Sequence, residues 1–183
     1  LTLDQPLYKK AQIILSQTRA AQPSSDLANV LLRCGPFHIL KAAYAAIGCL
    51  YEGSGLDAVA EEINYAKGTV VEMLKGNAFT RAKRFCQITA DALSSSVMAT
   101  VLDSFSDSDK EIIRTAAREG MSQDHTAMSA DAIGVLKRVD GAFQREMTLK
   151  AESECKTVKL WSQFVTIVDI INRFEYAERT SDF

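Results

Sequence analysis

Apolar side chains recur every three or four residues along most of this chain, which is the spacing of one face of an α-helix. Leu7, Ala11, Ile14 and Leu15 show the pattern near the start, and polar segments rich in serine, glycine or aspartate interrupt it further on. The pattern predicts helices from Asp4 to Gln22, from Ser25 to Gly35, and over residues 37–51, 56–64, 67–75, 79–102, 108–120 and 157–177. It also predicts a long helix that starts near Ser129 and includes Met147.

Capping residues support several of these boundaries. Asp4 is a suitable N-cap with Pro6 in the first turn, Ser25 can cap the second helix, and Ser108 with Glu111 has the spacing of a capping box. The chain has only 3 prolines and 9 glycines, whereas an all-β fold needs many turn residues. We therefore predict an all-α, multi-helix orthogonal bundle.

The last predicted helix is apolar on two faces. Val158, Trp161, Phe164, Val165 and Val168 lie on one, and Leu160, Ile167, Ile170, Ile171 and Phe174 on the other. A helix that is apolar on most sides is central in its fold or buried in a partner. Charged residues such as Lys159, Asp169 and Arg173 interrupt this stretch, so we expect no membrane span.

Composition and charge narrow the function classes. The 183 residues are 47% hydrophobic and 24% charged, with a formal net charge of -2, so any nucleic-acid contact must use a local basic patch. The four cysteines, Cys34, Cys49, Cys86 and Cys155, are widely spaced and form no C-x-x-C pair. This pattern is typical of a reducing compartment, and we expect a cytoplasmic protein.

One segment, residues 54–75, carries a motif with a physical rationale. Val59 and Ile63 share a helix face, small Ala60 suits a close helix crossing, and Asn64 tolerates the left-handed backbone of a tight turn. Val70, Met73 and Leu74 would turn back toward Val59 and Ile63, and Thr69 has capping-box spacing to Glu72. The pattern predicts two short crossed helices, with helix 37–51 as the third wall of their core.

This segment resembles the helix-turn-helix of bacterial GntR- and TetR-type regulators, whose pattern reads A-E-x-x-x-x-S-K-G-T-V-x-x-x-L. The match is Ala60-Glu61, Lys67-Gly68-Thr69-Val70 and Leu74. The resemblance implies that 67–75 is a recognition helix lying in the major groove of double-stranded DNA. The implied DNA-facing residues are Lys67, Gly68, Thr69, Val71, Glu72 and Lys75, with Arg81, Lys83 and Arg84 as downstream phosphate contacts.

The segment also departs from that pattern. Asn64 stands where a glycine is usual, Tyr65 replaces a small aliphatic residue, and no wing hairpin follows Gly76. Within 54–75, Lys67 and Lys75 face four carboxylates, Asp57, Glu61, Glu62 and Glu72. The alternative interpretation is two packed helices without a nucleic-acid role.

Other candidate chemistry favours simple structural roles. His38 lies at a helix start and His125 follows Asp124, without a recognisable metal or triad motif around either. Asp103, Asp107, Asp109 and Glu111 lack the glycine and the twelfth-position glutamate of a calcium loop, so we expect a helix-capping loop. Gly53-Ser54-Gly55 is interpreted as a turn, and Cys86 as a buried thiol. We predict no enzyme activity, no catalytic residue, no metal and no cofactor.

Two functions therefore stay open. The first is a dimeric, non-catalytic DNA-binding regulator, with residues 1–36 as an N-terminal helical extension, 37–84 as the helix-turn-helix-like unit and 85–183 as a regulatory or dimerisation region. The second is a helical assembly or scaffold subunit, similar to capsid, matrix or nucleoprotein subunits, supported by the two apolar faces of the last helix. Both predict a homodimer or a larger homo-oligomer.

Overall fold

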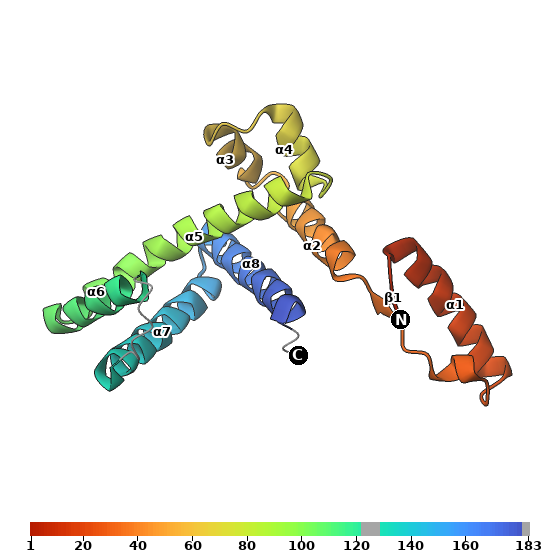
Figure 1. Cartoon of the computed structure of the whole chain (residues 1–183). Helices are drawn as coiled ribbons and strands as arrows, with labels where there is room; N and C mark the ends of the chain where they lie inside the picture. Colours follow the sequence, from red (N-terminus) through yellow and green to blue (C-terminus); the bar gives the residue numbers. More distant parts are fainter. Residues whose placement is uncertain (122–128, 181–183) are drawn as a thin grey trace. The chain divides into compact units, whose positions relative to one another are not determined.

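A computed structural model of the chain describes residues 1–121 and 129–180. The described residues form eight α-helices, one short 3-10 helix and one pair of two-residue strands, which confirms the predicted all-α, multi-helix fold (Figure 1). The elements are β1 (Thr2–Leu3), α1 (Gln5–Ala21), η1 (Asp26–Asn29), β2 (Arg33–Cys34), α2 (Pro36–Leu50), α3 (Leu56–Glu62), α4 (Lys67–Leu74), α5 (Phe79–Asp103), α6 (Asp107–Met121), α7 (Ala130–Ala151) and α8 (Lys156–Thr180).

The chain divides into two units. The first holds residues 1–86 and the C-terminal residues from 169 onward, and the second holds residues 87–168. The division falls inside α5 and inside α8, so each of these helices contributes to both units. The end of α8 belongs with the N-terminal unit. The predicted division of the chain at residues 36 and 84 stays a prediction.

The N-terminal part of the first unit begins with a short β-α-β arrangement. Strands β1 and β2 pair in parallel, with Thr2 opposite Arg33 and Leu3 opposite Cys34, and α1 and η1 connect them. Two-residue strands leave no alternating pattern in a sequence, so this pair was not predicted. Helix α1 is capped as predicted, because the Leu7 N–H donates to Asp4 Oδ1 at 3.1 Å.

Helices α2 and α4 pack closely against each other. Tyr44 and Ile47 of α2 are almost fully buried, as are Val70 and Met73 of α4. A side chain on Gly48 would overlap the backbone of Leu74, so the crossing requires glycine at this position. The predicted three-helix core therefore exists, and α3 contributes Ala60 as expected but Leu56 in place of Val59 and Ile63.

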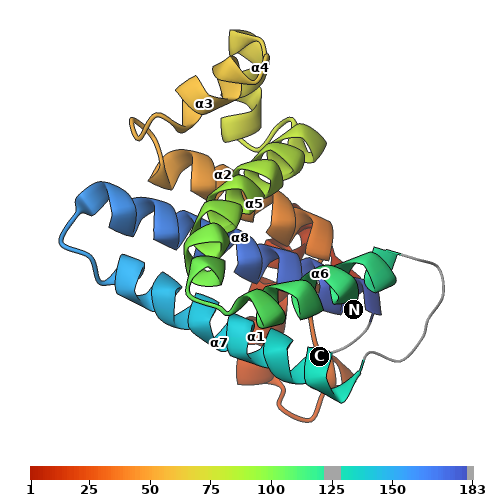
Figure 2. The same cartoon turned by 90° about the vertical axis from the view of Figure 1, so that its left-hand side faces the viewer.

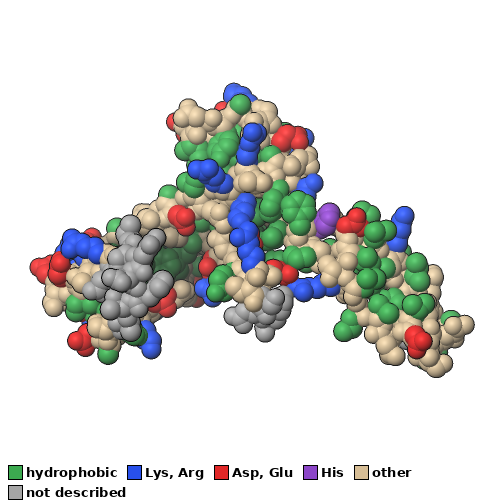
Figure 3. All heavy atoms as spheres, in the orientation of Figure 1, with side chains coloured by type: hydrophobic (Ala, Val, Ile, Leu, Met, Phe, Trp, Pro, Cys, Tyr) green, Lys and Arg blue, Asp and Glu red, His purple; other side chains and the backbone are tan. Residues whose placement is uncertain are grey.

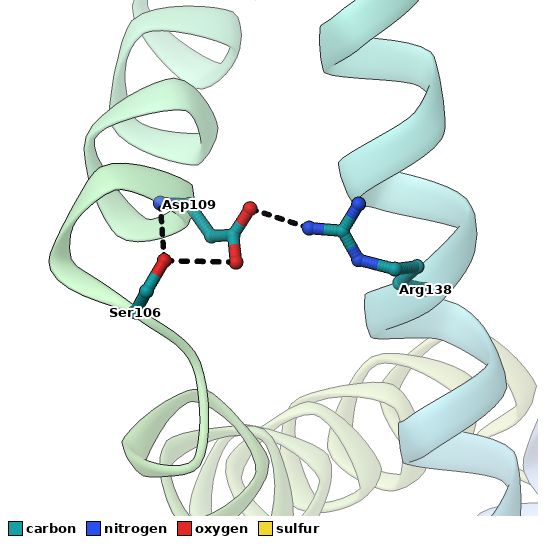
Figure 4. Close-up of polar contacts among 3 residues, drawn as sticks. All are labelled: Ser106, Asp109 and Arg138. Carbon is teal, nitrogen blue, oxygen red and sulfur yellow. Dashed lines mark hydrogen bonds and ion pairs between the residues drawn. The ribbon is translucent and has the colours of Figure 1, made fainter.

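In the second unit, α6 packs against α7, and the loop before α6 caps that helix (Figure 4). Ser106 Oγ accepts the Asp109 N–H at 3.2 Å and donates to Asp109 Oδ2 at 2.9 Å, while Arg138 of α7 binds Asp109 Oδ1. The predicted capping box at Ser108 and Glu111 was wrong, because α6 already begins at Asp107. The capping role predicted for this acidic loop is confirmed.

Helix α7 begins as predicted, since Ser129 Oγ accepts the Ala132 N–H at 3.2 Å. The first apolar face of α8 is largely buried, with Phe164 and Val168 nearly inaccessible, whereas Ile170 on the second face is exposed. Among the described helices, α5 has a length and composition that would allow a membrane crossing. Core helices of folded proteins share these properties, so α5 alone does not indicate a membrane protein.

Candidate functional site

The α3–α4 segment folds as two short helices joined by a tight turn (Figure 2). Helix α3 ends at Glu62, Asn64 has a left-handed backbone with φ 68°, and α4 begins at Lys67. Tyr65 anchors the turn by an edge-to-face contact with buried Phe85, with ring centroids 6.1 Å apart. The predicted helices and the special role of Asn64 are confirmed.

Helix α3 buries a face that differs from the predicted one. Leu56 and Ala60 are buried, whereas Val59 and Ile63 are 37% and 44% exposed. The prediction that Val59 and Ile63 form the core was therefore wrong. Leu56 and Ala60 are also four residues apart, so spacing alone could not distinguish the two faces of this short helix.

The residues predicted to face DNA lie mostly on the outer side of α4. Lys67, Gly68, Val71, Glu72 and Lys75 are exposed, and Thr69 is half-buried. The expected capping box between Thr69 and Glu72 does not form, because Ala66 occupies the N-cap position and provides no side-chain bond. Glu72 Oε2 instead accepts a hydrogen bond from Asn77 Nδ2 at 2.9 Å.

The three downstream cations differ in their availability. Arg81 and Arg84 are exposed at the start of α5. Lys83 is largely buried, and its Nζ lies 2.5 Å from Glu175 Oε1 of α8, which also binds Arg179. The ion pair with Glu175 compensates the charge of Lys83 within the first unit, and its phosphate contact stays a prediction.

A groove of about 580 Å³ lies along α2 and α4, and we call it the α2–α4 groove. Its apolar lining comes from Ala45, Gly48 and Cys49 on the α2 side and from Val70, Val71 and Leu74 on the α4 side. Its charged lining consists of Glu52, Asp57, Glu61, Lys67 and Lys75. Two predicted DNA-facing lysines and Val71 thus line the same groove as three carboxylates.

The carboxylates change the electrostatic character of the predicted site. Lys67 Nζ lies 3.8 Å from Glu61 Oε2, so its charge is partly compensated. Basic and acidic side chains both lie on the surface over α3 and α4 (Figure 3). The groove is therefore a mixed-charge surface with an apolar floor, not a continuous positive face.

Sequence reasoning missed the α2 half of this groove. Helix 37–51 was predicted as a wall of the same core, but the sequence did not show that Ala45, Cys49 and Glu52 line a groove beside α4. The turn at Gly53-Ser54-Gly55 was predicted, and it is closed by a hydrogen bond from Ser54 Oγ to the Tyr51 carbonyl at 2.7 Å. Gly53 and Gly55 both have positive φ.

The remaining candidate groups have structural roles. Cys86 is buried as predicted, and its burial raises the pKa of the thiol to about 12. His38 makes an edge-to-face contact with Phe37, with ring centroids 5.6 Å apart. His125 lies outside the described residues. Within residues 1–121 and 129–180, no three histidine, cysteine or acidic side chains form a potential metal site.

These observations define an all-α protein with a short helix-turn-helix-like segment beside an amphipathic groove. The chain belongs to the family described as a domain of unknown function, DUF8702, which it matches over residues 1–183. No curated protein and no solved structure is significantly similar to it.

Proposed function

We propose that this chain is a non-catalytic helical assembly subunit that binds another protein chain through the α2–α4 groove. The observation behind this proposal is the apolar floor of the groove, on which Val71 remains 48% exposed. Concave sites lined largely by apolar side chains commonly bind a protein or a small ligand.

Further exposed apolar side chains support an interaction role for the first unit. Val59 and Ile63 of α3, Leu50 of α2 and Ile14 of α1 are all exposed. Isolated exposed apolar residues are ordinary, but their presence on three elements of one unit favours association. The three carboxylates of the groove suit the polar rim of a protein interface and would repel a phosphate backbone.

Association can be tested with one substitution on the groove floor. Val71→Asp places a charge on an exposed position, so folding should persist while association weakens by at least tenfold. The measurement is the mass from multi-angle light scattering across a concentration series. The matched control is Ile133→Asp on α7, which is 42% exposed and lies in the second unit.

The masses of the unsubstituted chain and of the two variants show whether the groove mediates association. We expect the unsubstituted chain and Ile133→Asp to increase in mass with concentration, and Val71→Asp to remain near monomer mass. A monomer at every concentration for the unsubstituted chain, without added partner, would overturn self-assembly.

DNA binding is the second candidate, favoured by the two crossed helices and four exposed cations. Lys67, Lys75, Arg81 and Arg84 lie on α4, at its end, and at the start of α5. If all four contact phosphates, log Kobs for duplex DNA should fall against log salt with a slope of about −3 to −4.

A charge-reversal variant tests this candidate directly. Lys67, Lys75, Arg81 and Arg84 are changed together to glutamate, which should abolish any salt-dependent shift of a duplex in fluorescence anisotropy. Lys137, Arg145 and Lys150 of α7, changed to glutamate, provide a control in the second unit. Duplex binding that is equal for both variants would reject the helix-turn-helix as the DNA contact.

A further inference from the structure

Helix α1 is a basic, amphipathic helix. It contains Lys9, Lys10 and Arg19 and has no acidic residue between Gln5 and Ala21. Leu15 is buried, and α1 packs mainly on η1, β1 and β2. Leu7, Lys10 and Ile14 remain exposed beside this packed face.

The exposed side of α1 carries a stripe made of Leu7, Lys10 and Ile14, which we call the α1 stripe. These positions are three and four residues apart, so they lie on one helix face. Leu7 and Ile14 are each more than half exposed, and hydrophobic side chains gather on the surface over α1 (Figure 3). The stripe therefore presents two apolar side chains on either side of a cation.

The α2–α4 groove has complementary properties. Part of its lining is apolar, and its charged lining has three carboxylates, Glu52, Asp57 and Glu61, against two lysines. Lys67 pairs with Glu61, so Glu52 and Asp57 are the carboxylates considered for a cation from a partner. A groove of about 580 Å³ has room for a leucine and an isoleucine side chain, and helices commonly bind in grooves through residues at i, i+3 and i+7.

We propose that the α1 stripe of one copy binds the α2–α4 groove of a second copy. This inference rests on the proposed assembly function and names the partner of the same groove. Leu7 and Ile14 contact the apolar part of the lining. Lys10 lies near Glu52 and Asp57. The contact joins two different surfaces, so it closes by reciprocal exchange of α1 in a dimer or continues into longer assemblies.

Site-directed disulfide formation between copies tests the contact. Cys49 is a free, exposed thiol that lines the groove. All chains carry Cys34→Ser and Cys155→Ser, which removes the other accessible thiols. One chain also carries Ile14→Cys and Cys49→Ser, and a second chain of different length, made with a tag, retains Cys49 and Ile14.

Mild oxidation of the mixture should give a disulfide-linked heterodimer on a non-reducing gel, and neither chain alone should give a linked dimer. The matched control replaces Ile14→Cys by Ser16→Cys, which is exposed on another side of α1. Equal linking from positions 14 and 16 would overturn the proposal, as would no linking in a mixture that light scattering shows to be assembled.

Charge reversal provides an independent test. Lys10→Glu and Glu52→Lys should each weaken self-association about tenfold, and the double variant should recover most of the loss. Glu62→Lys, an exposed α3 position that does not line the groove, is the matched control for Glu52→Lys.

The tests distinguish this inference from the assembly function on which it rests. A chain that assembles, but shows neither the 14–49 disulfide nor rescue by the double variant, retains the assembly function and rejects α1 as the occupant. A chain that does not assemble rejects both.

Discussion

Tyr44, in the middle of α2, carries a buried hydroxyl that lowers the stability of the fold. Its side chain is almost completely buried and makes an edge-to-face contact with Phe79, yet no described group hydrogen-bonds to its hydroxyl. Burial, followed by nearby Cys86 and Glu175, raises the pKa of Tyr44 above its ordinary value, so the phenol stays neutral. A buried hydroxyl without a partner costs free energy that a phenylalanine would avoid.

We therefore expect Tyr44→Phe to raise the free energy of unfolding by about 1 kcal/mol. The ring contact with Phe79 is retained, because only the hydroxyl is removed. The measurement is a urea denaturation curve, with Tyr176→Phe at an exposed position of α8 as the control. A lower stability for Tyr44→Phe would show that the hydroxyl makes a favourable bond.

At the scale of the element, the cap of α6 makes the stability of the fold depend on pH. Hydrogen bonds from Ser106, together with the hydrogen bond and charge of Arg138, lower the pKa of Asp109 below its ordinary value of 3.8 (Figure 4). Because the folded-state pKa lies below the unfolded one, ionised Asp109 stabilises the fold above pH 3.8. This contribution decreases as the pH falls toward the folded-state pKa and is absent below it.

Asp109→Asn should therefore be less stable than the unsubstituted chain at pH 7, and the difference should disappear below the folded-state pKa. Thermal denaturation from pH 7 to pH 2.5 measures this change. Asp107→Asn removes a charge from the same turn at a residue without an ion pair in the described structure, so it is the control. A deficit for Asp109→Asn that stays constant with pH would contradict the role of the carboxylate.

The elements also show what could be predicted from the sequence. The long helices and the cap at Asp4 were predicted, because their signals are local. The choice of Ser106 over Ser108 was missed, because both serines precede an acidic residue by three positions. The buried face of α3 was also missed, since a seven-residue helix offers too few turns for a distinct period.

At the scale of the molecule, the candidate site arises from packing that local patterns do not encode. The exposed side of α4 was predicted, but its neighbours depend on the approach of α2 to Leu74 through Gly48. The same approach places Glu52 and Cys49 beside Lys67 and Lys75 in one groove. The segment that resembles a DNA-binding helix-turn-helix therefore lies beside a groove with mixed charge and a partly apolar lining.

The four cysteines are distributed over both units, so their alkylation rates depend on both folding and assembly. Cys49 and Cys155 are exposed, Cys34 is half-buried, and Cys86 is buried with its pKa raised to about 12. At pH 8 such a pKa makes the thiolate fraction of Cys86 about a thousandfold smaller than that of an ordinary cysteine. In the dilute native protein, iodoacetamide should therefore modify Cys49 and Cys155 quickly and Cys86 only after denaturation.

The alkylation rates of Cys49 and Cys155 should depend differently on protein concentration. The proposed assembly covers Cys49 but leaves Cys155 outside the groove. Mass spectrometry of labelled peptides should show the rate at Cys49 falling as the protein concentration rises, while the rate at Cys155 stays constant. Val71→Asp should remove this concentration dependence, since it prevents occupation of the groove. If both thiols slow equally, the groove is not the surface through which the chains associate.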